Sequence, residues 1–303
     1  LRAQGGSGDR AATTLLIGED GGSSGDGALL RLSSLGAATI ERANVPEAAQ
    51  ARARLQIGAG ALLDGGAALS LDSTGDSAID AGALLRGQRI DASAGHVRLD
   101  AQAASGDADG LVLGAGSLAQ FAQAKQVNLH SYGDMDFAGG LDLRVSNALT
   151  LSAGRFIGDG RDVSLSADQL TLSNQGASAA PADTVPGAGL LHLQGREVAF
   201  AGGDKQLTGF GAVAVDAAQT LYVRDRGQFD FGTRDVDLRT PLLLADAGAD
   251  QTLRTGGALR LQGSGASVNA AQPLGGRVTL VGASIDSNGL IRANSGGIVL
   301  RSS

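Results

Sequence analysis

A short apolar pattern that returns every 19 to 23 residues is the feature that most constrains this chain. Each occurrence is an apolar residue, any residue and a second apolar residue, as in Val127-Asn128-Leu129. Because side chains alternate between two faces of an extended chain, such a triplet is a strand with two side chains on one face and one on the other. The first residues of the triplets are Val127, Leu149, Leu170, Leu191, Val213, Val236, Leu259, Val278 and Ile298. A period of this length predicts structural units that repeat and stack.

Two further short apolar groups lie within each period. After Val127 these are Met135/Phe137 and Leu141/Leu143, separated by Gly, Asp and Ser residues. Three strands and three bends per period make a coil, and successive coils would pair their strands in parallel about 4.8 Å apart. We therefore predict an all-β, right-handed parallel β-helix with about three short strands per coil and about 12–14 coils. The alternative is a stack of antiparallel hairpins, but its typical Asn-Gly turn occurs only at Asn288-Gly289.

The composition suits a narrow solenoid. Gly accounts for 48 of the 303 residues and Pro for only 5, so tight corners can form without removing donors from a parallel ladder. Aromatic residues are 3% of the chain and Trp is absent. These numbers predict a core of stacked Leu, Val, Ile and Ala side chains.

Charge and cysteine content exclude several classes of function. The formal net charge is −7 and the only lysines are Lys125 and Lys205, which argues against nucleic acid and anionic membranes as partners. No cysteine is present, so the chain has neither disulfides nor thiolate metal ligands. No run of 18 apolar residues occurs, and we therefore expect no insertion into a membrane.

The chain divides into an irregular start and a regular remainder. Residues 1–54 are predicted to form irregular N-terminal coils, with a short helix over 46–54, where Pro46 and Glu47 precede good helix formers. Residues 55–303 are predicted to continue as one β-helix, with loop insertions near 103–110 and 174–189. We expect the whole to be a piece of a longer protein.

Several phrases around the strands resemble the degenerate coils of filamentous-haemagglutinin-like large exoproteins. They are Leu55–Ala61, Gly110–Gly116, Leu149–Gly154 and Ser284–Gly289. This resemblance implies an adhesin that is secreted or held at the bacterial cell surface, exported by a two-partner-secretion transporter in the outer membrane. Neither the Asn-Pro-Asn motif of the family's secretion domain nor the Val-Glu-Asn-Asn sequence that precedes toxin domains occurs here. The resemblance therefore implies a segment of the β-helical shaft.

The function that follows from this resemblance is structural and adhesive. A shaft segment would mediate attachment to host cells, to other bacteria or to matrix, by contact with carbohydrate or with a cell-surface protein. We expect no catalysis and no cofactor. The two loop insertions are the first places to look for binding, because insertions in repeat proteins often carry it.

The alternative is a lyase or hydrolase that acts on polysaccharide, since parallel β-helices also carry such enzymes. These sites need two or three carboxylates that converge on one outer face. Asp134 and Asp136 are one candidate pair, because they alternate with the apolar Met135 and Phe137. Asp225 and Asp230 are the other. The competing interpretation is that all four carboxylates are ordinary solvent-facing residues beside buried strands.

Histidines and outward-facing triplet residues complete the candidates. By strand alternation, the side chains of His130 and His192 are predicted to point outward. They lie about three coils apart, roughly 14 Å, so they are not expected to share a metal ion. In the triplet series His192 is predicted to lie between Thr171 and Ala214. Asp237 is predicted to form an ion pair with Arg260 in the next coil. The middle residues of the triplets, from Asn128 to Val299, predict an ordinary solvated surface without a metal site.

Overall fold

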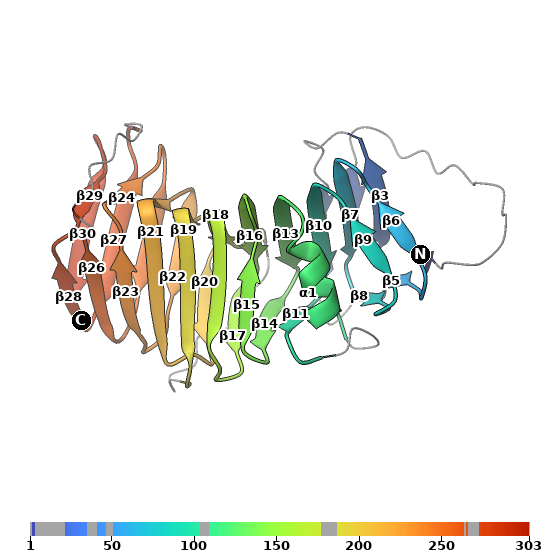
Figure 1. Ribbon diagram of the computed structural model, residues 1–303. Helices are drawn as coiled ribbons and strands as arrows, with labels where there is room; N and C mark the ends of the chain where they lie inside the picture. Colours follow the sequence, from blue (N-terminus) through green and yellow to red (C-terminus); the bar gives the residue numbers. More distant parts are fainter. Residues whose placement is uncertain are drawn as a thin grey trace.

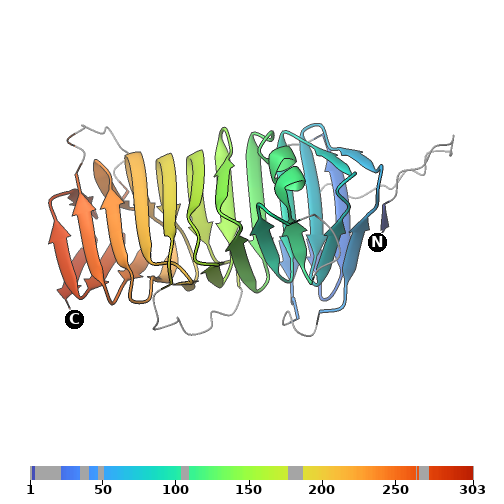
Figure 2. The ribbon, with the colours of Figure 1, turned by 60° about the horizontal axis from the view of Figure 1, so that its bottom comes forward.

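The computed structural model is a β-solenoid of about 10 turns whose strands pair mostly in parallel. It describes residues 2–3, 22–34, 41–46, 51–103, 109–176, 187–263, 265 and 273–302. Strands follow one another along a rod from the N-terminal end to the C-terminal end (Figures 1 and 2). The predicted fold class is confirmed, and the handedness stays a prediction. The predicted 12–14 coils exceed the observed number, because the even spacing used to count them also counted insertions.

One long sheet forms the first face of the rod. Its twelve strands, in spatial order, are β1 (Arg2–Ala3), β5 (Arg54–Ile57), β8 (Asp76–Ile79), β12 (Leu111–Leu113), β11 (Val97–Asp100), β14 (Asp134–Ala138), β17 (Arg155–Gly158), β20 (Lys205–Thr208), β22 (Arg226–Asp230), β25 (Asp250–Arg254), β27 (Arg277–Gly282) and β30 (Gly297–Ser302).

A second sheet covers the other two faces, because some of its strands run across a corner. Its main path is β3 (Ala28–Ser33), β7 (Ala68–Ser73), β10 (Arg89–Ala94), β13 (Gln126–Ser131), β16 (Ala148–Ser152), β18 (Val163–Ser173), β19 (Leu190–Phe200), β21 (Ala212–Val223), β23 (Asp235–Arg239), β26 (Ala258–Gln262) and β28 (Ser284–Ser287). Off this path lie β15 (Leu141–Arg144), β24 (Leu242–Ala245) and β29 (Leu290–Arg292). Two small parallel pairs are β2 (Gly22–Ser24) with β4 (Glu41–Ala43), and β6 (Leu62–Asp64) with β9 (Leu84–Arg86).

The long strands β18, β19 and β21 show that the triplets do not form one ladder. Leu191 pairs with Val163 and with Val213, not with Leu170. Leu170 is instead continued by Val198 and then by Leu221. The predicted neighbours of His192 are therefore half wrong: Ala214 is correct, but Ser164 lies where Thr171 was expected.

Insertions cause this change of face. Between β18 and β19 the chain omits its strand on the first face, where β17 pairs directly with β20. Residues 174–189 connect β18 to β19 with no described strand on the first face, so the triplet at Leu191 falls on the face that precedes the one expected from the period. A similar omission between β26 and β27, where β24 pairs directly with β29, moves Val278 and Ile298 onto the first face. Most of the predicted loop insertions, residues 104–108 and 177–186, lie outside the described residues.

The coil between β10 and β13 departs from the repeat in two ways. Strand β12 follows β11 in sequence but lies between β8 and β11 in the sheet. The next segment is the helix α1 (Ala115–Phe121), which stands where the repeat of three strands per coil predicts a strand. Leu118 and Phe121 are both buried, and a spacing of three residues places them on one face of a helix. The chain from 51 to 53 has no regular structure and Arg54 begins β5, so the described part of the predicted helix 46–54 is not helical.

Apolar side chains fill the interior as strand alternation predicted, but the core also contains aromatic rings in addition to the predicted aliphatic side chains. Leu191 and Leu193 are 1% and 0% exposed. Six of the seven phenylalanines, however, form a chain of ring contacts in the middle of the rod, in which Phe229 and Phe231 stack with ring centroids 4.2 Å apart. A side chain at Gly158 would collide with the ring of Phe210, so a glycine there lets an aromatic ring enter the core.

Two buried cations fasten corners beside these rings. The Lys205 ammonium donates hydrogen bonds to the carbonyl oxygens of Ala201, Gly202 and Gly203. The Arg234 guanidinium, 1% exposed, donates to three more carbonyls. Burial lowers the pKa of Lys205 to about 8, which leaves the amine mostly charged at neutral pH. These groups add donors to carbonyl oxygens at the corners, some of which also accept a backbone N–H.

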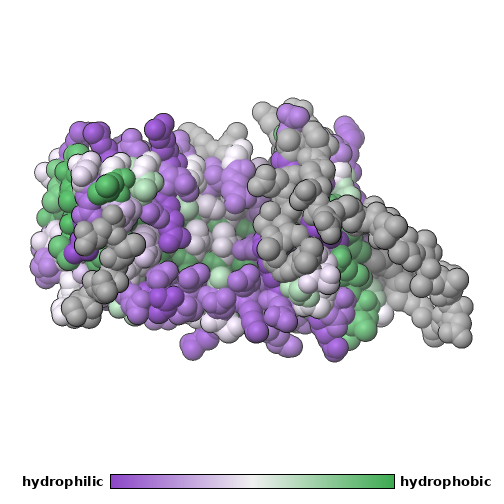
Figure 3. Space-filling view, turned by 90° about the horizontal axis from the view of Figure 1, so that it is seen from above, coloured by the Kyte–Doolittle hydropathy of each residue, from purple (hydrophilic) through white to green (hydrophobic). Residues whose placement is uncertain are grey.

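The two ends of the rod differ. At the N-terminal end β3 pairs antiparallel with β7 and so closes that face with a reversed strand. At the C-terminal end Leu290, Ile298 and Leu300 are about half exposed, at 52%, 45% and 51%. Apolar green surface gathers at this end in the space-filling view, on the left (Figure 3).

Candidate binding groove

A groove of about 1260 Å³ lies on the outer face of β7, β10, β13 and β16. Its floor consists of side chains that point away from the core, as strand alternation requires. Arg42 and Asn44–Pro46, which lie between β3 and β5 in the chain, line one part of it, and Gln175 and Gly176 line another. The groove therefore lies between two segments that leave the repeat.

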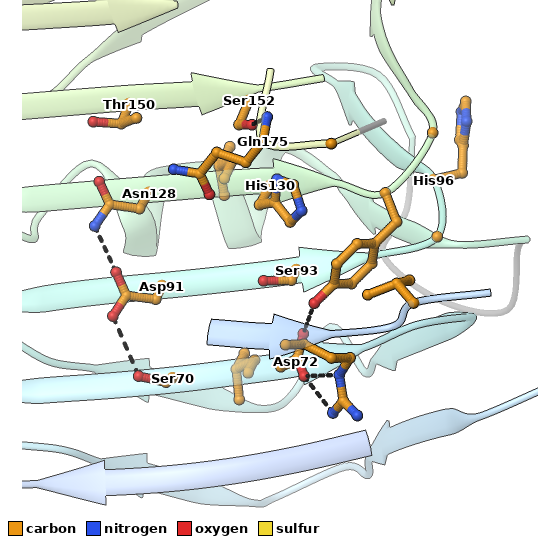
Figure 4. Close-up of a pocket in the computed structure, with 18 of the residues that line it drawn as sticks. Ser70, Asp72, Asp91, Ser93, His96, Asn128, His130, Thr150, Ser152 and Gln175 are labelled. Carbon is orange, nitrogen blue, oxygen red and sulfur yellow. Dashed lines mark hydrogen bonds and ion pairs between the residues drawn. The ribbon is translucent and has the colours of Figure 1, made fainter. Parts of the chain in front are cut away.

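Strand register arranges the floor in two rows. Ser70, Asp91, Asn128 and Thr150 are paired in sequence across the four strands and form the first row. Asp72, Ser93, His130 and Ser152 form the second row in the same way. Figure 4 shows both rows crossing the strands. With about 4.8 Å between neighbouring strands, each row extends roughly 14 Å along the rod.

Asp91 organises the first row. Its carboxylate accepts hydrogen bonds from Asn128 Nδ2 at 2.5 Å and from Ser70 Oγ at 3.2 Å (Figure 4). It also accepts one from Arg89 Nε at 2.8 Å. Its charge is thus compensated by an arginine from its own strand. The Thr150 hydroxyl, at the end of this row, makes no hydrogen bond to any other described side chain or backbone group.

A buried ion pair closes the β7 end of the second row. Arg42 donates to Asp72 Oδ2 through Nε at 2.9 Å and Nη2 at 2.6 Å, and both side chains are almost fully buried. The Tyr132 hydroxyl donates to the other oxygen, Asp72 Oδ1, at 2.7 Å. Burial and the Asp72 charge raise the pKa of Tyr132 well above its ordinary value. Tyr132 therefore stays a hydrogen-bond donor, and this end of the groove is rigid.

His130 is the unusual member of the second row. Its ring meets the Tyr132 ring edge-on, with centroids 4.5 Å apart. Its Nδ1 atom is buried and has no hydrogen-bond partner among the described residues. Burial lowers the pKa of His130 to about 4, so the ring is neutral at physiological pH. Its predicted outward parity is correct, but the side chain lies sheltered on the groove floor.

Asp134 and Asp136 share the outer face of β14, as the sequence predicted, yet each already has a cationic partner. Asp134 lines the groove and pairs with Arg155 at 2.5 Å. Asp136 pairs at 3.0 Å with His96, whose pKa this hydrogen bond raises. Each carboxylate is therefore already engaged by a side chain from a neighbouring coil.

Asp225 and Asp230 do not converge. Asp225 occupies the corner before β22, with a φ of 55°, and Asp230 is the last residue of that extended strand. Five residues of extended chain separate them by roughly 16 Å. Asp230 Oδ1 accepts a hydrogen bond from the Gly232 amide at 2.8 Å, a local turn contact. The two pairs are also distant from each other, because β17 and β20 separate β14 from β22.

The remaining sequence candidates have structural partners. His192 faces outward and contacts Asp216 at 2.6 Å. Asp237 pairs with Arg260 in the next coil at 3.3 Å, which confirms that predicted contact. Within the described chain, no three His, Asp or Glu side chains are grouped to hold a metal ion.

The groove was not predicted from the sequence, although several of its residues were singled out there, among them His130 and Asp134. Asn128 and Thr150 were expected to belong to an ordinary solvated surface, but both lie on the groove floor. A weak signal was present: the strands at β7, β10, β13 and β16 each carry at least two polar residues in alternation with apolar ones. Nothing in that alternation predicts the flanking segments that turn a flat face into a groove.

Comparison of the chain with models of protein families, with curated proteins and with solved structures found no match. The class of protein is therefore defined by the structure, as a β-solenoid with an outer polar groove. Across the described ranges, no helix has both the length and the apolar character to cross a membrane.

Proposed function

We propose that this chain is a structural and adhesive segment of a secreted or surface-bound bacterial exoprotein of the filamentous-haemagglutinin-like kind. The resemblance of its coil sequences supports this proposal, as does the parallel solenoid of about 10 turns. The observation that carries it is the state of the candidate carboxylates: Asp134 and Asp136 are each ion-paired, and Asp225 and Asp230 lie far apart. A rigid scaffold that carries a polar groove without converging free carboxylates suits attachment better than bond cleavage.

The proposed partners follow from the same resemblance. An outer-membrane transporter of the two-partner-secretion type would export the chain, which would fold outside the cell. There the rod would contact carbohydrate or protein on host cells, on other bacteria or in matrix. Export before folding suits a solenoid, because each coil contacts only its neighbours and can add to the preceding one.

An attachment assay tests the proposal. Beads coated with the 303-residue chain should bind to epithelial cells, to bacterial cells or to immobilised matrix more strongly than beads coated with the same chain after denaturation. In parallel, the chain should release neither reducing ends nor unsaturated uronides from polygalacturonate, alginate or heparan sulfate. Release of either product would favour the polysaccharide-active enzyme, and absence of attachment to all three surfaces would contradict the adhesive function.

A further inference from the structure

We propose that the groove over β7, β10, β13 and β16 is a binding site for an uncharged oligosaccharide that lies along the rod axis, across the four strands. This inference rests on the proposed adhesive function and gives it a site and a class of ligand. Charge, polar groups and dimensions support it separately.

The charges of the groove cancel locally. Three arginines line it, and each pairs with a carboxylate: Arg42 with Asp72 at 2.6 Å, Arg89 with Asp91 at 2.8 Å and Arg155 with Asp134 at 2.5 Å. A ligand with carboxylate or sulfate groups would have to displace one of these partners, and a cationic ligand would have to displace an arginine. In either case the displaced carboxylate or arginine would lose its ion-pair partner, which costs free energy. An uncharged ligand requires neither.

Neutral polar groups remain available on the floor. The hydroxyls of Ser93 and Thr150 have no partner among the described residues, and the same holds for His130 Nδ1. Because His130 is neutral above pH about 4, its ring can accept or donate one hydrogen bond according to tautomer. An apolar ligand would leave these groups unsatisfied at a cost in free energy. A ligand rich in hydroxyl groups, which both donate and accept, would satisfy them.

The dimensions fit a short chain of sugar rings. Each row presents one polar side chain per strand, about 4.8 Å apart, which is comparable with the length of one sugar unit. Four strands thus offer a repeating set of contacts to a repeating ligand. The buried Arg42–Asp72 pair closes one end of the second row, and Gln175 and Gly176 border the groove near Ser152, whose hydroxyl accepts a hydrogen bond from the Gln175 amide at 3.0 Å.

Titration calorimetry with defined oligosaccharides tests the site. The uncharged probes are hexamers of β-1,4-glucose, β-1,3-glucose, α-1,4-glucose and β-1,4-N-acetylglucosamine, and the acidic probe is a hexamer of galacturonic acid. At least one uncharged hexamer should bind, and its affinity should change less than about twofold when the salt concentration rises from about 0.1 to 1 M, because no ion pair forms with it.

Variants place the binding in the groove. Thr150→Val and Ser93→Ala each remove one hydroxyl, and each should weaken binding about three- to tenfold. Thr150→Trp should abolish it by filling the floor. Thr252→Trp is the matched control, because Thr252 is also half-buried in the middle of a strand, in the distant β25. It should bind as the parent does. Circular dichroism of each variant verifies the fold.

The outcomes separate this inference from the proposed function. If no uncharged hexamer binds, if only the acidic hexamer binds, or if Thr150→Trp binds as well as the parent, the groove site is wrong. Bead attachment that persists with folded Thr150→Trp would keep the adhesive function and reject the groove as its site. Hydrolysis of a bound hexamer would reject the adhesive function and keep the groove.

Discussion

The groove region, from β7 to β16, and the region from β18 to β27 are built from the same kind of coil but use it differently. We call the second one the regular region, because its strands follow the order of the sequence along the main path of each sheet, although two coils omit a strand. In the regular region the long strands β18, β19 and β21 run across a corner, phenylalanine rings stack inside, and buried cations fasten the turns. In the groove region one strand lies out of sequence order and a helix follows it before β13. Its polar side chains gather on the outside, where Arg42, Asn44–Pro46 and Gln175 to Gly176 border them.

This difference teaches where a solenoid can acquire a site. A repeated coil presents a nearly flat surface, on which outward polar side chains simply face water. Segments that leave the repeat supply walls, and the same polar side chains then form the floor of a groove. The described start of the insertion at 174–189 provides one such wall, whereas the floor residues come from ordinary strands.

The largest expected effect is the loss of a buried arginine that hydrogen-bonds to corner carbonyls in the regular region. Arg234→Ala removes a guanidinium that donates to the carbonyl oxygens of Phe210, Leu207 and Phe231. Losing three hydrogen bonds from a fully buried guanidinium should lower the free energy of unfolding by about 3–5 kcal/mol. Urea denaturation measures the change. The control is Arg239→Ala, whose side chain is 51% exposed and whose loss should cost no more than about 0.5 kcal/mol. Equal effects of the two substitutions would contradict the fastening role.

The second prediction concerns inward and outward residues of β19. Leu193→Ala should cost about 2–5 kcal/mol, because it removes a fully buried side chain. His192→Ala should cost about 0.5–1.5 kcal/mol, because it breaks the contact with Asp216. Leu62→Ala, at a position 58% exposed in β6, should be nearly neutral. The same denaturation experiment ranks the three, and a neutral Leu193→Ala would reverse the assignment of faces.

The third prediction tests the shelter of His130 by pH. Its pKa of about 4 in the folded protein lies below the ordinary value of 6.5, so between these values the unfolded chain binds a proton that the folded chain excludes. This difference should lower stability by up to about 3 kcal/mol as pH falls from 6.5 to 4. His130→Phe keeps a ring beside Tyr132 and should remove that part of the pH dependence.

His96 serves as a control, because its effect on stability should change with pH in the opposite direction to that of His130. Its hydrogen bond to Asp136 raises its pKa in the folded protein, so it contributes stability below pH 6.5 that is lost as pH rises through the folded pKa. His96→Phe should therefore destabilise the chain more at pH 5.5 than at pH 8. Thermal denaturation across this range follows both variants, and parallel pH profiles for His130→Phe and the parent would show that His130 is not sheltered.

The smallest expected effect belongs to the exposed ion pair Asp237–Arg260 on the outside of the regular region. A double-mutant cycle with Asp237→Ala and Arg260→Ala should give a coupling energy smaller than any of the stability changes predicted above, those of the exposed controls excepted, because Asp237 and Arg260 are both solvated. The coupling should disappear in about 1 M salt, where the Debye length is about 3 Å. Coupling that persists in salt would indicate a far less solvated pair than the structure shows.

The sequence by itself determined which class of fold forms and which side chains face inward. Alternation within Leu191-His192-Leu193 fixes two buried leucines and one outward histidine whatever strand lies next to them, because parity is a local property of an extended chain. The same rule placed Asp134 and Asp136 together on an outer face. The pairing of Asp237 with Arg260 was also predictable, since no insertion lies between their coils.

Only the tertiary structure decided which strands are neighbours. The face on which a strand lies depends on the loops and omitted strands that separate it from the preceding strand. The insertion after β18 moved Leu191 from the Leu170 column to the Val163 column, although the period of the triplets hardly changed. Leu118 and Phe121 formed a helix because an apolar spacing of three residues fits a helix face better than a strand face. The groove itself needed segments distant in sequence to lie beside a flat polar face, and no local pattern specifies such a meeting.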